Sequence, residues 1–319
     1  MQEAPEPHEE ALRSGHVALV GRPNVGKSTL LNALIGEKLS IVTPRAQTTR
    51  EAVTGILTTD TAQIAFIDTP GLLQPQYALH TAMLYAAMRA LEGADLILLL
   101  LDATRPGEVP EGDPLDALKA RQDRLVVAIN KTDVAGSDGV KELASWTRRT
   151  LGLEARFIAA TVGGGVDMLL EDLVARLPVH PFLYPRDELA VQPVRFFVAE
   201  LVRETVFEEY EQEVPYAAVV RVEEYREAQD PLYVRATIYV ERDSQKAIVI
   251  GQGGSRIRRL GERSREKVEA FLGRRVFLDL WVKALPGWRR KAGTLRYLGY
   301  LLPGDHGEQR AEAQEPASP

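Results

Sequence analysis

The chain has 319 residues, enough for two ordinary domains, and its 45% hydrophobic and 26% charged residues are typical of a globular protein. It contains no cysteine, which excludes disulfides, thiolate metal sites and cysteine nucleophiles and fits a reducing cytoplasm. The net charge of −6 argues weakly against a nucleic-acid partner, but only as an average over the whole chain.

The first half alternates short apolar runs with helical segments, a rhythm typical of a mostly parallel sheet with helices on both faces. Residues 1–14 are acidic and polar, so we expect a flexible tail there and no secretory signal. The most apolar run, residues 96–101, is too short to span a bilayer and indicates a buried strand. The α/β domain is predicted over residues 15–180, with strands at residues 16–21, 63–68, 95–102, 125–130 and 156–160 and helices at residues 27–35 and 168–177.

Prolines interrupt regular structure after residue 178, and we place a linker at residues 181–193. A second domain, of the α+β class, is predicted over residues 194–302, followed by a flexible tail at residues 303–319. Its expected order is a helix from Val194, strand-like runs at 216–223 and 233–240, a glycine-rich turn, a basic helix ending near Gly273, a strand at 275–283 and a short helix. No internal repeat is visible.

The segment Gly21–Ser28 matches the phosphate-loop pattern between a predicted strand and a predicted helix. Glycines let backbone N–H groups approach phosphates, and the helix N-terminus favours an anion. Lys27 reaches the β- and γ-phosphates in such loops, and Ser28 supplies an oxygen to Mg²⁺. From this loop we assign to the phosphates Gly21, Arg22, Pro23, Asn24, Val25, Gly26, Lys27, Ser28 and Thr29.

A second motif, Asp68-Thr-Pro-Gly71, ends a predicted strand, where ligand-binding residues of open α/β sheets gather. Asp68 is expected to hold Mg²⁺ through water, and the Gly71 amide to sense the γ-phosphate. Leu72 follows, where many switch GTPases carry a glutamine that orients the attacking water. The phosphate assignment therefore also includes Asp68, Thr69, Pro70, Gly71 and Leu72.

The tetrapeptide Asn130-Lys131-Thr132-Asp133 ends another strand and favours GTP over ATP. Asp133 is placed to accept both N–H groups of the guanine edge, while Asn130 braces the loops. Adenine would leave that carboxylate buried without a partner.

Together the three motifs resemble the translation-factor-related GTPases. Residues 21–31 and Ala46-Gln47-Thr48-Thr49-Arg50 resemble the Era family of bacterial ribosome-assembly GTPases. The resemblance implies that Gln47, Thr48, Thr49 and Arg50 form the first switch, with Thr48 or Thr49 as a Mg²⁺ ligand. It also places Asn24 where related GTPases that lack the glutamine ligate K⁺, so Lys27 and Asn24 are the expected catalytic residues.

The chain departs from this family at the last guanine contact, where Ala159-Ala160 replaces the usual Ser-Ala. The Ala160 amide is expected to reach the guanine carbonyl. The missing hydroxyl and the glycines at 163–165 predict a loose loop and put affinity in question more than specificity.

The second domain contains a strongly basic stretch. From Arg242 to Arg296, Lys and Arg outnumber Asp and Glu by ten, so the rest of the chain carries −16. Charge alone does not separate a polyanion-binding module from a solvated helix face. The loop Gly251–Gly254 before a basic helix is typical of KH domains, which clamp a single-stranded backbone. The expected RNA-binding residues are Ile250, Gly251, Gln252, Gly253, Gly254, Arg256, Arg258 and Arg259, with Ile248, Ile250, Ile257 and Leu260 lining a groove for bases.

The Era resemblance continues through this half in residues 241–251, Leu280-Trp-Val-Lys283, Gly287-Trp288 and Leu298-Gly-Tyr300. It implies a P-loop GTPase domain followed by a type II KH domain that binds near the 3′ end of small-subunit ribosomal RNA during subunit assembly. We expect a cytoplasmic monomer, with weak peripheral association with the inner membrane face left open. Trp281 is expected in the core, whereas Trp288 could stack on a base.

Three other classes of protein share some of these features. An RNA-binding protein with a vestigial phosphate loop is disfavoured by the intact Lys27, Ser28, Asp68 and Asp133. The tandem-domain ribosome GTPase needs two phosphate loops, whereas the sequence of this chain contains a single one. The related tRNA-modifying GTPase relies on a C-terminal cysteine, which is absent.

Overall fold

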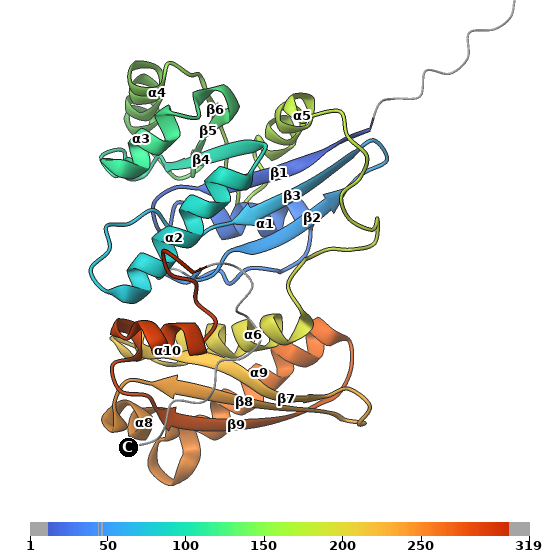
Figure 1. Cartoon of the computed structure of the whole chain (residues 1–319), viewed down its shortest axis with the longest axis vertical. Coiled ribbons are helices and arrows are strands. Elements are labelled where there is room, and N and C mark those ends of the chain that lie inside the picture. Colours follow the sequence, from blue (N-terminus) through green and yellow to red (C-terminus); the bar gives the residue numbers. More distant parts are fainter. Residues whose placement is uncertain (1–11, 44, 46, 306–319) are drawn as a thin grey trace, which may run out of the picture. The chain divides into compact units, whose positions relative to one another are not determined.

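The computed structural model describes residues 12–43, 45 and 47–305 (Figure 1). The two predicted tails therefore lie largely outside the described residues. The chain divides into a first unit, Met1–Glu37, Val53–Thr69 and Arg89–Val191, and a second unit, Lys38–Ala52, Pro70–Met88 and Gln192–Pro319. Two segments from the first half of the chain, residues 38–52 and 70–88, thus belong to the second unit.

The first unit contains a six-stranded sheet in the order β2-β3-β1-β4-β5-β6. Its strands are β1 Arg13–Val20, β2 Val53–Thr58, β3 Ala62–Asp68, β4 Leu96–Asp102, β5 Leu125–Asn130 and β6 Ala155–Phe157. All neighbours pair in parallel except β2, which runs antiparallel to β3. Strand β2 was not predicted, and β1 begins two residues before the expected domain boundary.

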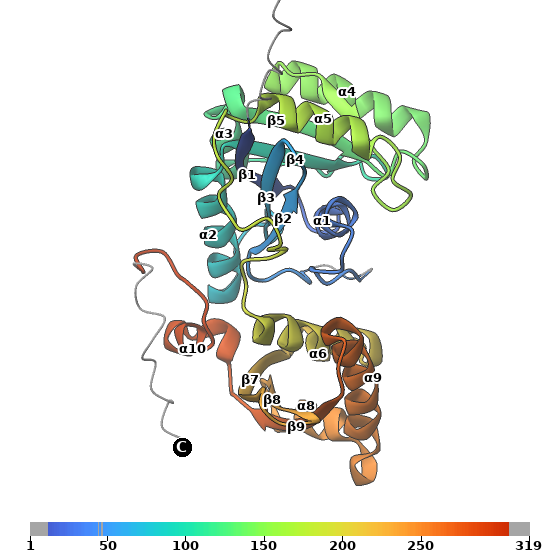
Figure 2. The same ribbon diagram turned by 90° about the vertical axis from the view of Figure 1, so that its right-hand side faces the viewer.

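Helices cover both faces of this sheet, and Figure 2 shows α1 and α3 on opposite sides of it. Every residue of β4 is buried, as expected for a strand with both faces covered. The helices are α1 Lys27–Ile35, α3 Asp113–Lys119, η1 Gln122–Arg124, α4 Ser137–Leu151 and α5 Val166–Arg176, while α2 Ala78–Gly93 begins in the second unit and ends in the first. The predicted α/β architecture is confirmed.

The segment predicted as a linker pairs with the edge of the first unit's sheet. The Ile56 amide donates to the Leu189 carbonyl at 2.8 Å, and Gly55 forms an antiparallel bridge with Ala190. This pairing covers the outer edge of β2.

The second unit has a three-stranded sheet in the order β7-β8-β9, with β8 antiparallel to β7 and parallel to β9. Its elements are α6 Val194–Glu209, α7 Val214–Ala217, β7 Val219–Arg226, β8 Leu232–Val240, α8 Asp243–Ile250, η2 Gln252–Gly254, α9 Ser255–Leu272, β9 Val276–Ala284, η3 Trp288–Arg290 and α10 Ala292–Tyr297. The predicted second domain of α+β class is confirmed, with helix and strand order α-α-β-β-α-α-β from α6 to β9 and the 3₁₀ turn η2 between α8 and α9.

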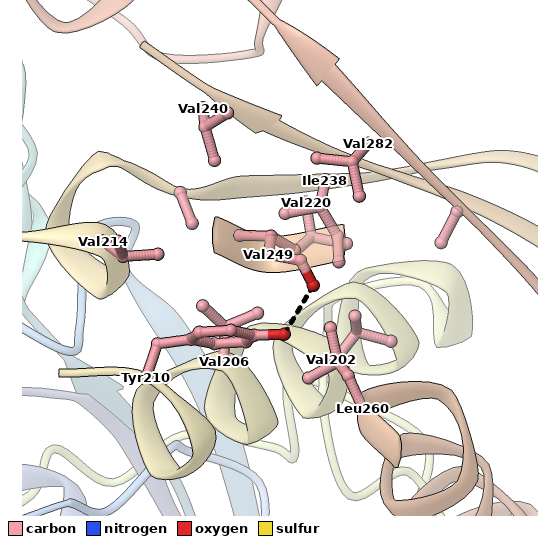
Figure 3. Packing of buried hydrophobic residues seen from close by; sticks show 12 residues of the cluster. Val202, Val206, Tyr210, Val214, Val220, Ile238, Val240, Val249, Leu260 and Val282 are labelled. Carbon is pink, nitrogen blue, oxygen red and sulfur yellow. Dashed lines mark hydrogen bonds between the residues drawn. The ribbon is translucent and has the colours of Figure 1, made fainter. Parts of the chain in front are cut away.

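The core of this unit lies between the sheet and helices α6, α8 and α9 (Figure 3). Alternate β8 residues such as Ile238 and Val240 point into it, and Val202 of α6 and Leu260 of α9 meet them. The Tyr210 hydroxyl donates to the Val249 carbonyl at 2.9 Å, and burial raises the pKa of Tyr210 to about 12. This bond joins the end of α6 to α8.

Several predictions for this unit were wrong in detail. Helix α8 between the second strand and the glycine-rich turn was not predicted. Leu260 is fully buried in the core and does not line a groove. Trp281, expected in the core, is 52% exposed, whereas Trp288 is fully buried and donates through Nε1 to the Ala217 carbonyl at 2.8 Å. Within the described ranges, no helix has the length and apolar character that crossing a bilayer requires.

Candidate nucleotide and RNA sites

The first unit brings the phosphate loop, the first two residues of the Asp68–Gly71 motif and the guanine motif to one edge of its sheet. Leu19 of β1 pairs with Asp68 at the end of β3, and Asp102 of β4 pairs with Asn130 at the end of β5. Because these strands are parallel, their carboxyl ends meet at the same edge, where open α/β sheets bind ligands.

Two glycines let the loop Gly21–Ser28 take its path. A Cβ on Gly21, whose φ is 150°, would lie 2.4 Å from the Leu100 carbonyl oxygen. A Cβ on Gly26, whose φ is 101°, would lie 2.3 Å from Nδ2 of Asn130. Glycine is therefore required at both positions, and α1 begins directly after Gly26 with its N-terminus at the loop.

Lys27 is buried inside this loop. Its Nζ donates to the carbonyl oxygens of Gly21 at 3.1 Å and Arg22 at 3.0 Å. Burial lowers the pKa of Lys27 to about 8, although the nearby Asp68 carboxylate acts in the opposite direction. A buried ammonium of this kind is strongly favoured by an incoming phosphate.

Ser28 and Asp68 supply oxygens of the kind that Mg²⁺ prefers. The Ser28 hydroxyl donates to Oδ2 of Asp68 at 2.6 Å, and Asp68 is fully buried. Thr69 fixes the chain after Asp68, because its hydroxyl donates to the Leu19 carbonyl at 2.7 Å. This donor set fits a magnesium ion next to the phosphate loop.

Asn130 joins the phosphate loop to the loop after β6. Its Nδ2 donates to the Val25 carbonyl at 2.8 Å, and its Oδ1 accepts the Ala160 amide at 3.0 Å. The Ala160 amide, predicted to meet the guanine carbonyl, is thus engaged by Asn130. A second brace closes this loop, since the Ala159 amide donates to the Gly164 carbonyl at 2.8 Å. Backbone pairing thus stabilises a loop that was expected to be loose.

The other residues of the Asn130–Asp133 motif also hold the site. Nζ of Lys131 donates to the Asn24 carbonyl at 2.7 Å and to Asp102 at 2.5 Å. Burial opposes ionisation of Asp102, but hydrogen bonds from Lys131 and Thr104 hold its pKa below the usual value. The Thr132 hydroxyl donates to the Ile158 carbonyl at 2.9 Å, and Asp133 is exposed beyond it.

The remaining switch residues lie in the second unit, in segments 38–52 and 70–88. The Thr48 carbonyl accepts a hydrogen bond from Arg203, and Gln47 lies 3.3 Å from Nε2 of His80. Pro70, Gly71 and Leu72 are buried.

A groove of about 420 Å³ lies beside the Gly251–Gly254 loop in the second unit. Apolar residues, two arginines and one glutamate line it, from the end of the loop, from α9 and from the edge strand β9: Gly254, Ile257, Arg258, Gly261, Glu262, Arg265, Phe277, Leu278 and Leu280. Phe277 is 57% exposed at this groove. Arg265 and the β9 residues are absent from the predicted RNA-binding set, although the basic helix and the predicted strand after it indicated where such residues lie.

The basic residues of α9 divide between two faces. Arg258 lines the groove, whereas Nε of Arg259 pairs with Glu209 of α6 at 3.0 Å. Arg263 and Lys267 also pair with acidic residues of α6. Only part of the predicted basic surface is therefore available to a polyanion through unpaired side chains, and the Arg259 assignment stays a prediction.

Comparisons with known proteins agree with the order of the two predicted domains. A family described as "50S ribosome-binding GTPase" matches residues 16–131, and a KH domain family matches residues 202–289. GTPase Era of Thermotoga maritima is 40% identical over 284 residues, which cover 88% of this chain and 95% of the relative. The chain belongs to the Era family of GTPases.

Two solved Era structures are similar along most of the chain. A single-residue variant of Aquifex aeolicus Era bound to GDP·AlF4− is 38% identical with a TM-score of 0.85, and the match covers 91% of this chain and 100% of that one. Era in complex with MgGDPNP and nucleotides 1506–1542 of 16S ribosomal RNA is 37% identical, with the same TM-score and coverage. Membership of the Era family confirms the predicted GTPase activity and the P-loop GTPase domain followed by a KH domain.

Proposed function

We propose that this Era-family GTPase binds GTP at the carboxyl edge of its first sheet and single-stranded ribosomal RNA in the groove beside Gly251–Gly254. The RNA is expected near the 3′ end of small-subunit ribosomal RNA, and the role is assembly and maturation of that subunit. The observation that supports this most is the 91% of the chain that matches an Era complex with both a nucleotide and such RNA.

In the nucleotide site, we assign the phosphates to the Gly21–Ser28 loop with Thr29, and to Asp68–Leu72. Lys27 binds the β- and γ-phosphates, and Asn130–Asp133 with Ala159-Ala160 bind guanine. For the Ala160 amide to reach guanine, it must share or exchange its hydrogen bond to Asn130.

Ser28, Asp68 and either Thr48 or Thr49 are the proposed residues for Mg²⁺, which supplies charge neutralisation for phosphoryl transfer. Leu72 cannot hold a water molecule, so this chain orients the attacking water without the usual side chain. Asn24 is the proposed K⁺ residue. Its backbone is left-handed with φ of 65°, and Lys131 holds its carbonyl oxygen.

In the RNA site, the loop glycines let phosphates approach the backbone, and Arg256 and Arg258 neutralise them. Ile250, Gln252 and Arg259 complete the proposed set, and Phe277 offers an exposed ring on which a base can stack. We further propose that the protein works as a cytoplasmic monomer, with weak association with the inner membrane face as an alternative to be tested.

Binding of a labelled RNA of nucleotides 1506–1542 tests this function, with an RNA of shuffled sequence as the control. Gly253→Asp should abolish binding, because a carboxylate in the loop repels phosphates. Residue 253 has open space around a Cβ, and its left-handed φ of 58°, which strains most side chains, is one that aspartate adopts more readily than most residues. GTP hydrolysis without RNA should stay at the wild-type rate. Equal RNA affinity of wild type and variant would contradict the RNA site.

A further inference from the structure

The buried carboxylate of Glu204 in α6 forms ion pairs with two lysines. Only 1% of this side chain is exposed. Its Oε2 accepts hydrogen bonds from Nζ of Lys38 at 2.7 Å and from Nζ of Lys267 at 2.8 Å. Burial opposes ionisation, but these two ammonium groups hold the pKa of Glu204 below its usual value.

The two lysines belong to segments with different proposed functions, nucleotide switching and RNA binding. Lys38 is the first residue of segment 38–52, which contains the switch residues Thr48 and Thr49. Lys267 belongs to α9, which starts at the RNA-binding loop and carries Arg258. One oxygen atom therefore joins the nucleotide switch segment to the RNA-binding helix.

The neighbouring residue strengthens the link on the switch side. Arg203 is 2% exposed, is paired with Glu200 at 2.5 Å, and donates to the Thr48 carbonyl. Helix α6 thus contacts segment 38–52 at two places, Lys38 and Thr48. Because a buried charge that loses a partner costs free energy, the Glu204 carboxylate opposes the withdrawal of either lysine.

We propose that Glu204 is a positioning residue that couples the nucleotide state of the first switch to RNA binding by α9. The inference rests on the proposed function of the two sites. A movement of the switch segment that withdraws Lys38 leaves Glu204 to Lys267 alone and tightens that pair. RNA contact with α9 then changes with nucleotide, and by reciprocity RNA changes nucleotide affinity by the same factor.

The competing explanation is that these ion pairs only fasten α6 to α9. Glu209 provides the matched control, because it pairs with Arg259 and Arg263 across the same helices and is bonded to no residue of segment 38–52 in the contacts described. A purely structural role predicts equal effects of Glu204→Gln and Glu209→Gln. The coupling role predicts an effect of Glu204 alone.

The experiment measures the affinity of the 1506–1542 RNA in the presence of a non-hydrolysable GTP analogue and of GDP, and takes the ratio. We expect a ratio of about tenfold for the wild type and about twofold for Glu204→Gln. Because Glu204→Gln alters a buried pair and could fail to fold, Lys38→Met is the second variant. Lys38 is half exposed, and its removal keeps the Glu204–Lys267 pair. Lys141→Met, which removes an exposed lysine of the first unit, is its control.

A ratio that falls in Lys38→Met and Glu204→Gln but holds in Lys141→Met and Glu209→Gln supports the coupling role. A ratio near one in the wild type, or an unchanged ratio in Lys38→Met, overturns it while the two binding sites stand. Failure of the wild type to bind the RNA or GTP at all would instead contradict the proposed function.

Discussion

Nη1 of Arg50 donates a hydrogen bond of 2.6 Å to the carbonyl oxygen of Ala218, the residue before strand β7. Nη2 of the same guanidinium donates to the Tyr216 carbonyl at 2.9 Å, and the group lies over the Trp288 ring. Burial lowers the pKa of Arg50. The last residue of the predicted first switch is therefore a structural part of the KH unit.

Arg50→Met should destabilise the protein, because it leaves buried carbonyl oxygens without a donor. We expect the free energy of unfolding to fall by about 3 kcal/mol, and by less in Arg50→Lys, which keeps one donor group. Urea unfolding followed by tryptophan fluorescence measures this. Arg148→Met, which removes an exposed ion pair with Glu154, should leave the midpoint unchanged. An unchanged midpoint in Arg50→Met would show that the contact contributes little.

The depressed pKa of Lys27 predicts a pH dependence of nucleotide binding. Between pH 8 and about 10.5 the unfolded chain holds the proton that the folded, nucleotide-free protein has lost, so stability without nucleotide rises with pH in this window. Phosphates favour the charged ammonium, so nucleotide binding takes up protons and weakens above pH 8. Titration calorimetry in buffers of different ionisation enthalpy should give an uptake of about half a proton at pH 8 and about a tenth at pH 7. No dependence on buffer at pH 8 would show that Lys27 is already fully charged.

Asp133→Asn should change the base preference from guanine to xanthine. The asparagine NH₂ group can donate a hydrogen bond to the 2-carbonyl of xanthine. It cannot accept a hydrogen bond from the 2-amino group of guanine. Titration of the variant with GTP, XTP and ATP should show GTP affinity reduced by about a hundredfold or more and XTP preferred. Wild-type GTP affinity in the variant would remove Asp133 from the guanine site.

Hydrolysis should depend on K⁺, because Leu72 provides no water-orienting group and the proposed substitute is an ion beside Asn24. At fixed ionic strength we expect turnover to be about tenfold faster in K⁺ than in Na⁺. Asn24→Ala should lose this response and still bind GTP. Identical rates of the wild type in the two salts would leave Asn24 with a role in loop structure only.

Local motifs were enough to predict the fold class and the convergence of the nucleotide motifs. The reason is that parallel strands put their carboxyl ends at one edge, so Ser28, Asp68 and Asn130 meet whatever the loops do. Which side chains of a helix lie in the core depends on packing, which the motifs do not indicate. Leu260 lies in the basic helix after the glycine-rich loop and was expected to line the groove, yet its position on that helix faces the core.

The largest difference concerns the switch residues. Nothing in the run Gln47–Arg50 shows that it belongs to a unit built mainly from residues 192–319, because its partners Ala218 and Arg203 lie more than 150 residues away along the chain. Likewise, Arg258 and Arg259 are alike in sequence, but one lines the groove and the other pairs with Glu209. Such assignments depend on contacts between distant elements, which spacing and charge do not encode.

Crosslinking the protein to RNA in cells and sequencing the bound fragments tests most directly whether this GTPase acts on small-subunit ribosomal RNA. Wild type and Gly253→Asp should be compared, with each purified protein also incubated with ribosomal RNA in GTP analogue and in GDP. We expect fragments enriched at the 3′ end of small-subunit ribosomal RNA, dependent on the nucleotide and lost in the variant. Fragments spread over unrelated RNAs, or the same enrichment with Gly253→Asp, would contradict the proposed function.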